Sequence, residues 1–394
     1  MVKQYFVYTY LLCLLISYFC PMNFTHWWQL LFYFFCGITL IQVFYYLFFF
    51  SRLAIYKPRA RPVSQTHPVT VIICARDEAA NLAKNLPGAL VQQYSTTHEV
   101  IVVDDNSFDD SKYLLEELQK TFKQLHVVEL KQEAKFIPGK KFPLSVGIKT
   151  AKYEVVLLTD ADCVPASEFW IDKMQQSFDS TTEIVLGFGA YHKKKGLLNK
   201  IIRWETFHTA LQYFSYALAG IPYMGVGRNL SYKKEIFYRH KGFTAHNNIP
   251  SGDDDLFINM AATNKNTRIN IDPKAFTLSE PARTWGQWIK QKHRHYSTGK
   301  FYKPLHKILL GLYSISYFIY FPLLAAVIVY YSWKWALIVF GIRFILQLFI
   351  LYPCMKKLQE RSLFPWILFI DIGMFFYYLL FALALIKKPK PTWK

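Results

Sequence analysis

Charged and amide side chains lie at or just beyond the ends of three apolar, β-branched segments of this sequence. In chain order the segments are 69–74, 100–105 and 155–160, and the side chains are Arg76, Asp77, Glu78 and Asn81, then Asp104, Asp105, Asn106, Ser107 and Asp109, then Asp160 and Asp162. Such segments are typical of buried parallel strands, whose carboxyl ends share the edge of a sheet that binds ligands. Each side chain alone could cap a helix or close a turn. Together they predict a polar binding crevice.

Asp160 and Asp162 form a pair of carboxylates at the end of the third segment. Two carboxylates in one crevice repel each other unless a cation lies between them, and Mg²⁺ or Mn²⁺ suits such oxygen ligands. A divalent ion between these carboxylates and a diphosphate would neutralise the charge that builds on a leaving group. The pair therefore predicts metal-assisted transfer from a nucleotide sugar.

The elements that must position these residues lie in the middle of the chain. Between the three segments, residues 79–92, 109–123 and 142–151 have the apolar spacing of helices. Strands that alternate with helices are typical of a parallel sheet with helices on its faces. We therefore expect residues 51–306 to form an α/β domain with a mostly parallel, Rossmann-like sheet.

Apolar segments flank this domain on both sides. Residues 5–20 and 27–50 predict two transmembrane helices within residues 1–50, and 308–331, 335–352 and 363–386 predict about three within 307–394, which ends in a basic tail. Arg343 and Asp371 fall inside these predicted spans, where ionised side chains pair with each other or line a polar path.

The net charge of +19 accompanies a hydrophobic content of 53%. Its Lys and Arg residues gather where the apolar segments meet the domain, as in Arg52, Lys57, Lys303 and Lys307. This distribution is typical of the cytoplasmic face of a membrane protein, whereas no nucleic-acid-reading motif is present. We expect an integral protein of a bacterial cytoplasmic membrane with its domain in the cytosol. Three C-terminal crossings would leave the basic tail outside, so one segment could be re-entrant or interfacial.

These motifs resemble the family-two glycosyltransferases of the GT-A fold, particularly membrane-integrated members related to cellulose and hyaluronan synthases and to lipid glycosyltransferases. The resemblance covers residues 67–300. It implies a nucleotide-diphospho sugar of the UDP or GDP type as donor.

The resemblance also implies roles for the residues at the strand ends. Ala75, Arg76, Glu78 and Asp105 would contact the base and ribose of the donor. Asp160 and Asp162 would hold the sugar, ribose and metal, with Asp162 as the favoured metal ligand. In the run 139–151, either Lys140 or Lys141 would lie near the diphosphate, unless this run is only a solvated basic turn.

The acidic run SGDDDLF at 251–257 resembles the family motif that supplies the catalytic base. Such a base must remove the proton of an acceptor hydroxyl as it attacks the anomeric carbon. Alignment on Leu256 favours Asp253, alignment on Gly252 favours Asp254, and Asp255 remains a third choice. We predict Asp253 in preference to Asp254. The run could equally be a capped helix start, and both interpretations hold together.

The segment 285–302 resembles the family's Gln-x-x-Arg-Trp motif on an interfacial helix. It implies that Gln291 and Arg294 contact the donor. His295 stands where the motif has tryptophan, which argues against processive polymer synthesis. A membrane-surface anchor is the alternative for this basic, amphipathic stretch.

We therefore predict an inverting glycosyltransferase that uses a membrane-associated acceptor, either lipid-linked or a glycan, in contact with membrane lipids. Inversion is implied by the resemblance alone. A processive polysaccharide synthase and a non-catalytic membrane-bound binding or scaffold protein of the same fold are the alternatives.

Overall fold

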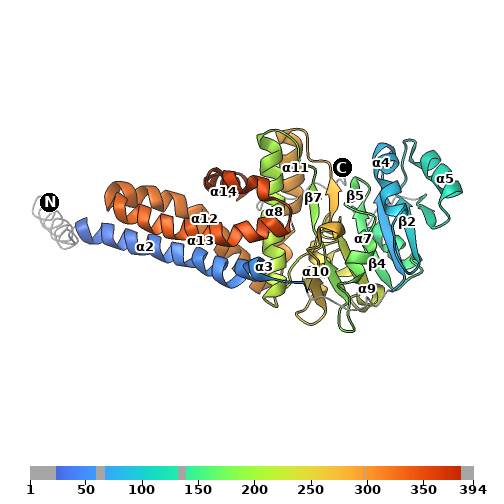
Figure 1. The fold of residues 1–394 in the computed structure, drawn as a ribbon, viewed down its shortest axis with the longest axis horizontal. Coiled ribbons are helices and arrows are strands. Elements are labelled where there is room, and N and C mark those ends of the chain that lie inside the picture. The colour runs from blue at the N-terminus through green and yellow to red at the C-terminus, as the bar shows by residue number, and fades with distance from the viewer. Residues whose placement is uncertain (1–23, 59–66, 132–138, 297, 383–394) are drawn as a thin grey trace, which may run out of the picture.

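The computed structural model describes residues 24–58, 67–131, 139–296 and 298–382. An α/β unit forms one end of the molecule, and a bundle of long helices projects from it (Figure 1).

A seven-stranded sheet in the order β3-β2-β1-β4-β8-β6-β9 forms the centre of the α/β unit. Its strands are β1 (Val69–Ala75), β2 (His98–Asp104), β3 (Leu125–Glu129), β4 (Val155–Asp160), β6 (Ile184–Leu186), β8 (Leu230–Lys233) and β9 (Thr267–Ile269). Only β8 runs antiparallel to its neighbours, β4 and β6. The predicted mostly parallel α/β sheet is confirmed, and the three apolar segments are its adjacent strands β2, β1 and β4.

Alternate residues of β1 belong to two separate cores, one on each face of the sheet. Val71 and Ile73 pack in a core with helices α4, α5 and α7, whereas Ile72 and Cys74 pack in a core with α6, α8 and α10. The helices of the unit are α4 (Ala79–Leu90), α5 (Ser111–Thr121), α6 (Lys141–Thr150), α7 (Trp170–Gln175), α8 (Leu197–Leu218), α9 (Lys234–Arg239), α10 (Asp255–Ala261) and α11 (Trp285–Tyr296). Burial on both faces explains why these strands are continuously apolar.

The strand register brings the polar residues together. Ala75 at the end of β1 lies opposite Asp104 of β2, and Cys74 lies opposite Asp160 of β4. Because the three strands are parallel and adjacent, the side chains that follow them meet at one edge of the sheet.

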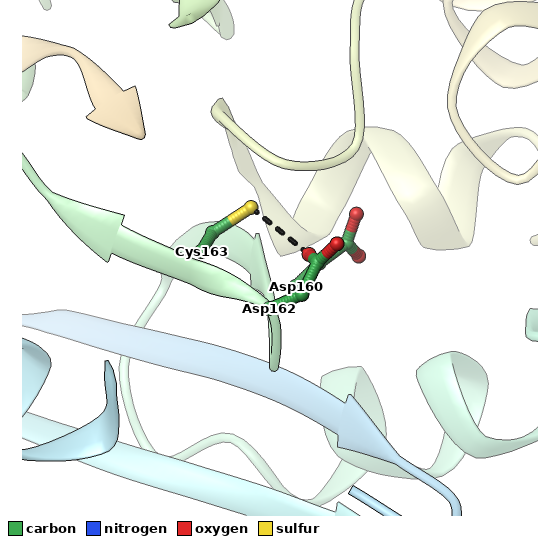
Figure 2. A group of neighbouring side chains, drawn as sticks. All are labelled: Asp160, Asp162 and Cys163. Carbon is green, nitrogen blue, oxygen red and sulfur yellow. Dashed lines mark hydrogen bonds between the residues drawn. The ribbon is translucent and has the colours of Figure 1, made fainter. Parts of the chain in front are cut away.

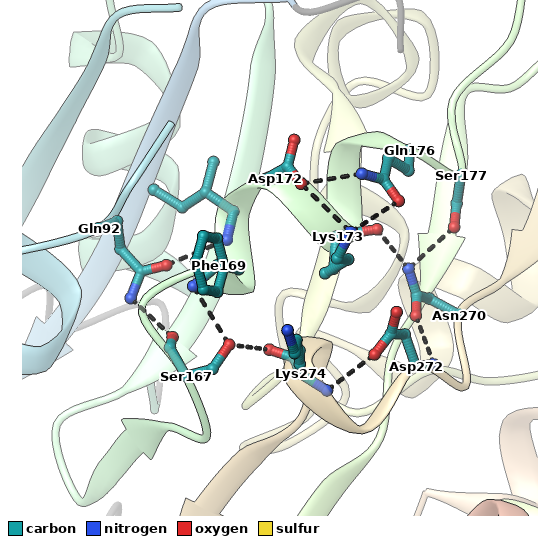
Figure 3. Close-up of polar contacts among 11 residues, drawn as sticks. Gln92, Ser167, Phe169, Asp172, Lys173, Gln176, Ser177, Asn270, Asp272 and Lys274 are labelled. Carbon is teal, nitrogen blue, oxygen red and sulfur yellow. Dashed lines mark hydrogen bonds and ion pairs between the residues drawn. The ribbon is translucent and has the colours of Figure 1, made fainter. Parts of the chain in front are cut away.

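A second sheet of three short strands lies next to the first. Its order is β5-β10-β7, with β5 (Cys163–Pro165), β10 (Thr277–Ser279) and β7 (Gly189–Tyr191). The chain after β5 is fixed by polar contacts, which Figure 3 shows. The side-chain amide of Gln92 donates to the Ser167 carbonyl at 3.0 Å, and that of Asn270 donates to the Lys173 carbonyl at 2.6 Å. These contacts fix the residues that follow β5 and the helix α7, and β5 itself begins directly after Asp162.

Helix α8 connects the α/β unit to the long helices. It contacts β7 and β9 of the two sheets and also the membrane-side segments η1 (Tyr45–Phe50) and α3 (Ser51–Ile55). Most of its side chains are buried, which accounts for apolar residues around most of its surface.

Four helices in the described part of the chain are long and apolar enough to cross a membrane, and they indicate membrane association. They span His26–Ile55, Pro304–Tyr330, Trp333–Lys357 and Arg361–Leu380. The first runs through most of α2 (Phe24–Phe44), η1 and α3. The second and third are α12 (Pro304–Tyr330) and α13 (Trp333–Lys357), and the fourth includes most of α14 (Ile367–Ala382). The helix predicted at 5–20 lies outside the described residues, as does the basic tail.

An ionic cluster lies at the centre of these long helices. Arg343 of α13 and Asp371 of α14 form a fully buried ion pair. Gln42 of α2 accepts a 2.8 Å hydrogen bond from Arg343, and Tyr317 of α12 donates a 2.8 Å bond to Asp371. The pairing expected for these two ions is confirmed, and their cluster joins all four long helices.

Candidate active site

A cavity of about 920 Å³ opens at the carboxyl edge of the central strands and continues toward the long helices. Its walls come from the ends of β1 and β4, residues 223–228 and 250–255, helices α8 and α11, and facing sides of α12 and α14. All of the predicted site residues line it except Ala75 and Asp105, which are buried. The structure therefore brings together residues that are about 220 positions apart in the sequence.

The loops after β1 and β2 hold each other in place. Ser107 accepts a 2.9 Å hydrogen bond from the backbone N–H of Asp77, and Asp77 accepts one of 2.8 Å from the N–H of Phe108. Asp109 accepts a 2.9 Å bond from the N–H of Ala79 at the start of α4. These polar side chains therefore stabilise the two loops. This agrees with the alternative from the sequence that such side chains close turns or cap helices.

Arg76 and Glu78 are the residues of the first loop that line the cavity. The guanidinium of Arg76 lies 4.0 Å from the carboxylate of Asp105, whose own N–H donates to the Ala75 carbonyl at 2.8 Å. Asp105 thus lies directly behind Arg76. It could orient this arginine or reach a ligand beside it, and the roles of all four residues remain predictions.

Asp160, Asp162 and Cys163 place three potential metal-ligand atoms within 4.8 Å of one another (Figure 2). The thiol of Cys163 is buried, 3.3 Å from Asp162 and 2.9 Å from the hydroxyl of Ser279. Burial and the two carboxylates raise the pKa of Cys163, so the thiol keeps its proton. Mg²⁺ and Mn²⁺ prefer oxygen ligands to sulfur, so the two carboxylates are the candidate ligands and Cys163 lies next to them.

The charges around the two carboxylates fit a divalent cation. Desolvation by the surrounding protein and the nearby charge of Asp160 raise the pKa of Asp162, as expected for two carboxylates that repel each other. Asp160 differs because Lys140 forms an ion pair with it, and this ammonium lowers the pKa of Asp160 in spite of burial. A cation bound at Asp162 would relieve the remaining repulsion, and Mg²⁺ and Mn²⁺ prefer oxygen ligands of this kind.

The structure separates the two adjacent lysines that the sequence left open. Lys140 lines the cavity beside Asp160. Lys141 is fully buried, does not line the cavity, and donates to three backbone carbonyls of the 246–251 loop. Lys140 is therefore the lysine that a diphosphate could reach.

Both carboxylate oxygens of Asp254 accept hydrogen bonds from the protein backbone. One carboxylate oxygen accepts a 2.7 Å hydrogen bond from the N–H of Gly227, and the other accepts a 2.7 Å bond from the N–H of Asp255 at the start of α10. Burial, together with the charges of Asp253 and Asp255, raises the pKa of Asp254 to about 8. Asp254 thus acts as a helix cap and holds the glycine-containing loop at 225–227.

The other two acidic residues differ in their surroundings. Asp255 accepts hydrogen bonds from the hydroxyls of Thr298 and Tyr302 and is buried. The side chain of Asp253 lines the cavity, and among the described residues it has no hydrogen-bond partner. Asp253 is therefore the carboxylate of this run that is free to meet a substrate.

Helix α11 is fixed against α8 by a buried ion pair between Lys292 and Glu205. Gln291 and Arg294 line the cavity on the same helix, and the amide of Gln291 donates to the hydroxyl of Tyr191 at 3.3 Å. The predicted contact residues of α11 therefore face the site.

His295 also lines the cavity, at the position where the family motif has tryptophan. Surrounding protein atoms and the cations Lys292, Arg294 and Arg228 lower the pKa of His295 well below its usual range. A neutral imidazole therefore replaces the indole at this position.

Arg228 is a cavity residue that the sequence reasoning missed. Its guanidinium lies over the ring of Tyr191, 4.5 Å from the ring centroid; its charge contributes to the lowered pKa of Asp160 and partly opposes the rise in the pKa of Asp162. A Cβ on Gly189 would lie 2.5 Å from the Arg228 side chain, so this glycine makes room for it. The feature of the sequence that could have indicated Arg228 is its place as a single arginine between the glycine-containing residues 223–227 and the strand β8.

Part of the α/β unit is similar to known proteins. Residues 70–241 match the model of the glycosyl transferase family 2. The chain is 31% identical over 101 residues to a beta-monoglucosyldiacylglycerol synthase of Nostoc sp., which is 25% of this chain and 21% of that protein. It is 25% identical over 160 residues to a poly-beta-1,6-N-acetyl-D-glucosamine synthase of Staphylococcus aureus, which is 39% of this chain and 37% of that protein. The matched region thus spans well under half of each of these relatives.

A solved structure is similar over nearly the whole chain. It is the mannosyltransferase PcManGT from Pyrobaculum calidifontis in complex with GDP-Man and Mn²⁺, with a TM-score of 0.57, 18% identity, and coverage of 91% of this chain and 99% of that one. This likeness confirms the predicted GT-A type fold. The family model thus matches residues 70–241 of the α/β unit, and this match ends before the acidic run at 253–255.

Proposed function

We propose that this protein is an inverting glycosyltransferase that moves a sugar from a UDP- or GDP-linked donor to a hydroxyl of a lipid-linked acceptor. The observation that carries the proposal is a single cavity that contains Asp160 and Asp162 at one wall and Asp253 at another, and that continues between α12 and α14. A transferase of this kind needs a donor site, a base and an acceptor path in one space.

The donor would lie at the carboxyl edge of β1, β2 and β4. Arg76, Glu78 and the buried Asp105 are placed to contact the base and ribose, beside Ala75 at the end of β1. Lys140, Arg294 and Arg228 add positive charge around the position of the diphosphate. Three cationic side chains at one end of a mostly apolar cavity favour a dianionic leaving group.

Asp162, with Asp160 beside it, would hold the Mg²⁺ or Mn²⁺ ion, which would supply positive charge to the leaving diphosphate. Lys140 fixes the orientation of Asp160 through their ion pair. Cys163 and Ser279 support the same turn from behind.

Asp253 would accept the proton of the acceptor hydroxyl as that oxygen attacks the anomeric carbon. It lies in the cavity, whereas Asp254 and Asp255 are held by hydrogen bonds to the protein. Attack by the acceptor directly on the donor carbon is a single displacement and inverts the anomeric centre.

The acceptor would reach this base from the membrane side. Gly311, Ser314, Ile315 and Phe318 of α12 and Met374, Tyr377 and Tyr378 of α14 line the far end of the cavity. Ile315 and Phe318 are 56% and 39% exposed, so this end offers apolar surface to a lipid chain. Ser314, Tyr377 and Tyr378 add hydroxyl-bearing side chains to this lining, which suits the polar head of such a lipid. Nucleotide sugars are made in the cytosol, which agrees with the basic clusters at the domain side of the long helices.

The first test is binding of UDP and GDP to the detergent-purified protein by calorimetry, with Mn²⁺ and then with EDTA. We expect metal-dependent binding of one of the two nucleotides, and its loss in Asp162→Asn. A folded protein that binds neither would overturn the proposal in favour of a non-catalytic membrane protein.

A second test addresses the acceptor. With a UDP- or GDP-sugar and vesicles of bacterial lipid extract, we expect a single sugar to appear on lipid, and Ser314→Trp to block this transfer while leaving nucleotide binding intact. Soluble chains of many sugars would instead show a processive polysaccharide synthase. His295, at the position of the motif tryptophan, argues against that outcome.

A further inference from the structure

The ammonium group of Lys141 is bonded to the backbone of a distant loop. Its Nζ atom donates to the carbonyl oxygens of His246, Ile249 and Ser251 at 2.6, 2.7 and 2.9 Å. The side chain is fully buried. A lysine has three N–H donors, and here all of them are used on one loop.

This loop leads directly to the proposed base. Ser251 is two residues before Asp253, and Gly252 between them has φ +97°, where a Cβ would lie 2.5 Å from the side chain of Leu256. The turn that aims Asp253 therefore has a restricted backbone. Lys141 bonds to the residues that precede this turn, whereas α10 follows it.

Gly139 holds the same loop by close contact. Its φ is +81°, and a Cβ at this position would lie 2.1 Å from the carbonyl oxygen of Pro250. Gly139 and Lys141, two positions apart where α6 begins, thus contact consecutive residues of the loop at 249–251, one through packing and one through hydrogen bonds.

Lys140, between them in the sequence, faces the opposite way and forms its ion pair with Asp160. Residues 139–141 therefore contact the donor carboxylate on one side and the loop of the base on the other.

We propose that Lys141 is a positioning residue for the transfer step, which fixes the 246–252 loop so that Asp253 meets the acceptor hydroxyl, while Lys140 serves donor binding. This inference rests on the proposed role of Asp253. Without the three hydrogen bonds, the loop carries three unsatisfied carbonyls and the carboxylate loses its fixed position. Displacement of a catalytic group by about 1 Å lowers turnover by roughly 100-fold.

The test compares variants of the full-length protein in detergent, measuring nucleotide binding with Mn²⁺ and the turnover number for sugar transfer separately. We expect Lys141→Met to lower turnover by roughly 10- to 100-fold with the affinity for UDP or GDP unchanged within about twofold. Lys140→Met should weaken nucleotide binding. Lys234→Met is the matched control, because Lys234 also donates to a backbone carbonyl, that of Ala151, far from the loop. It should match the wild type.

A double variant separates positioning from a general structural role. In Asp253→Asn the base is already absent, so adding Lys141→Met should lower the residual transfer little further. If Lys141→Met fails to fold, Gly139→Ala moves the same loop through Pro250 and should show the same loss of turnover. Full turnover in Lys141→Met, a loss of nucleotide binding like that of Lys140→Met, or additive effects with Asp253→Asn would each overturn the inference. Absence of transfer in the wild type would instead contradict the proposed function.

Discussion

The hydroxyl of Tyr302 donates a 2.7 Å hydrogen bond to the buried carboxylate of Asp255. Tyr302 follows the short turn η4 (Gly299–Phe301), between α11 and the membrane helix α12, whereas Asp255 begins α10. Thr298 donates to the same carboxylate. The segment that joins the cavity-lining α11 to the long apolar helix α12 is therefore bonded to a residue two positions from the proposed base.

Removal of these donors should loosen the link between α11 and the base. We expect Tyr302→Phe combined with Thr298→Val to lower the turnover number roughly 10-fold or more, because the buried Asp255 carboxylate loses both side-chain partners. The affinity for UDP or GDP should change less, since the donor residues at the strand ends are untouched. Steady-state kinetics with separate nucleotide binding measures both. Weaker nucleotide binding with unchanged turnover would contradict this expectation.

The three acidic residues should respond differently to amide substitution. Asp253→Asn should keep nucleotide binding and lower transfer by about 100- to 10,000-fold, the range for loss of a general base. Asp255→Asn should lower thermal stability as well as transfer, because its oxygens are bonded to Thr298 and Tyr302. Transfer assays beside melting curves distinguish the two patterns. Near-normal transfer in Asp253→Asn would exclude it as the base.

Because Arg343 and Asp371 form a buried ion pair, replacing only one of them should greatly lower the free energy of unfolding. Arg343→Met should destabilise the protein by about 3–5 kcal/mol, because it leaves a buried carboxylate without its ion. The double variant Arg343→Met with Asp371→Leu should recover most of that loss. Thermal unfolding in detergent gives both values. The exposed pair of Lys84 and Glu280 is the control, since Lys84→Met should cost less than about 1 kcal/mol.

The raised pKa of Asp254 predicts a pH dependence of stability. Its pKa is about 8 in the folded chain against an ordinary value of 3.8. Between these values the folded state holds a proton that the unfolded state has released, so its stabilising effect is complete below the ordinary pKa and is lost as the pH rises toward 8. The melting temperature of the wild type, relative to Asp254→Asn, should therefore fall across this window. A constant difference would contradict this assignment.

Much of the fold could be predicted from the sequence because its signals are local. Continuous apolar β-branched segments predicted β1, β2 and β4, and long apolar runs predicted the helices that follow residue 303. The family resemblance rested on short motifs such as the Asp160–Asp162 pair, and the match at 70–241 confirms it. Charge at the strand ends predicted where the cavity lies, because parallel strands share one edge.

Tertiary structure alone decided which member of each ambiguous set faces the cavity. Lys140 and Lys141 are adjacent and chemically identical, yet Lys140 forms an ion pair with Asp160, whereas Lys141 is hydrogen-bonded to the 246–251 loop. Asp253 differs from Asp254 and Asp255 only through partners such as Gly227 and Tyr302, which are 27 and 47 positions away along the chain. A sequence shows the charge of a side chain, but its direction depends on backbone turns and long-range contacts. The sequence therefore determined the sheet and the class of chemistry, and packing between distant segments decided which residue of each pair can perform it.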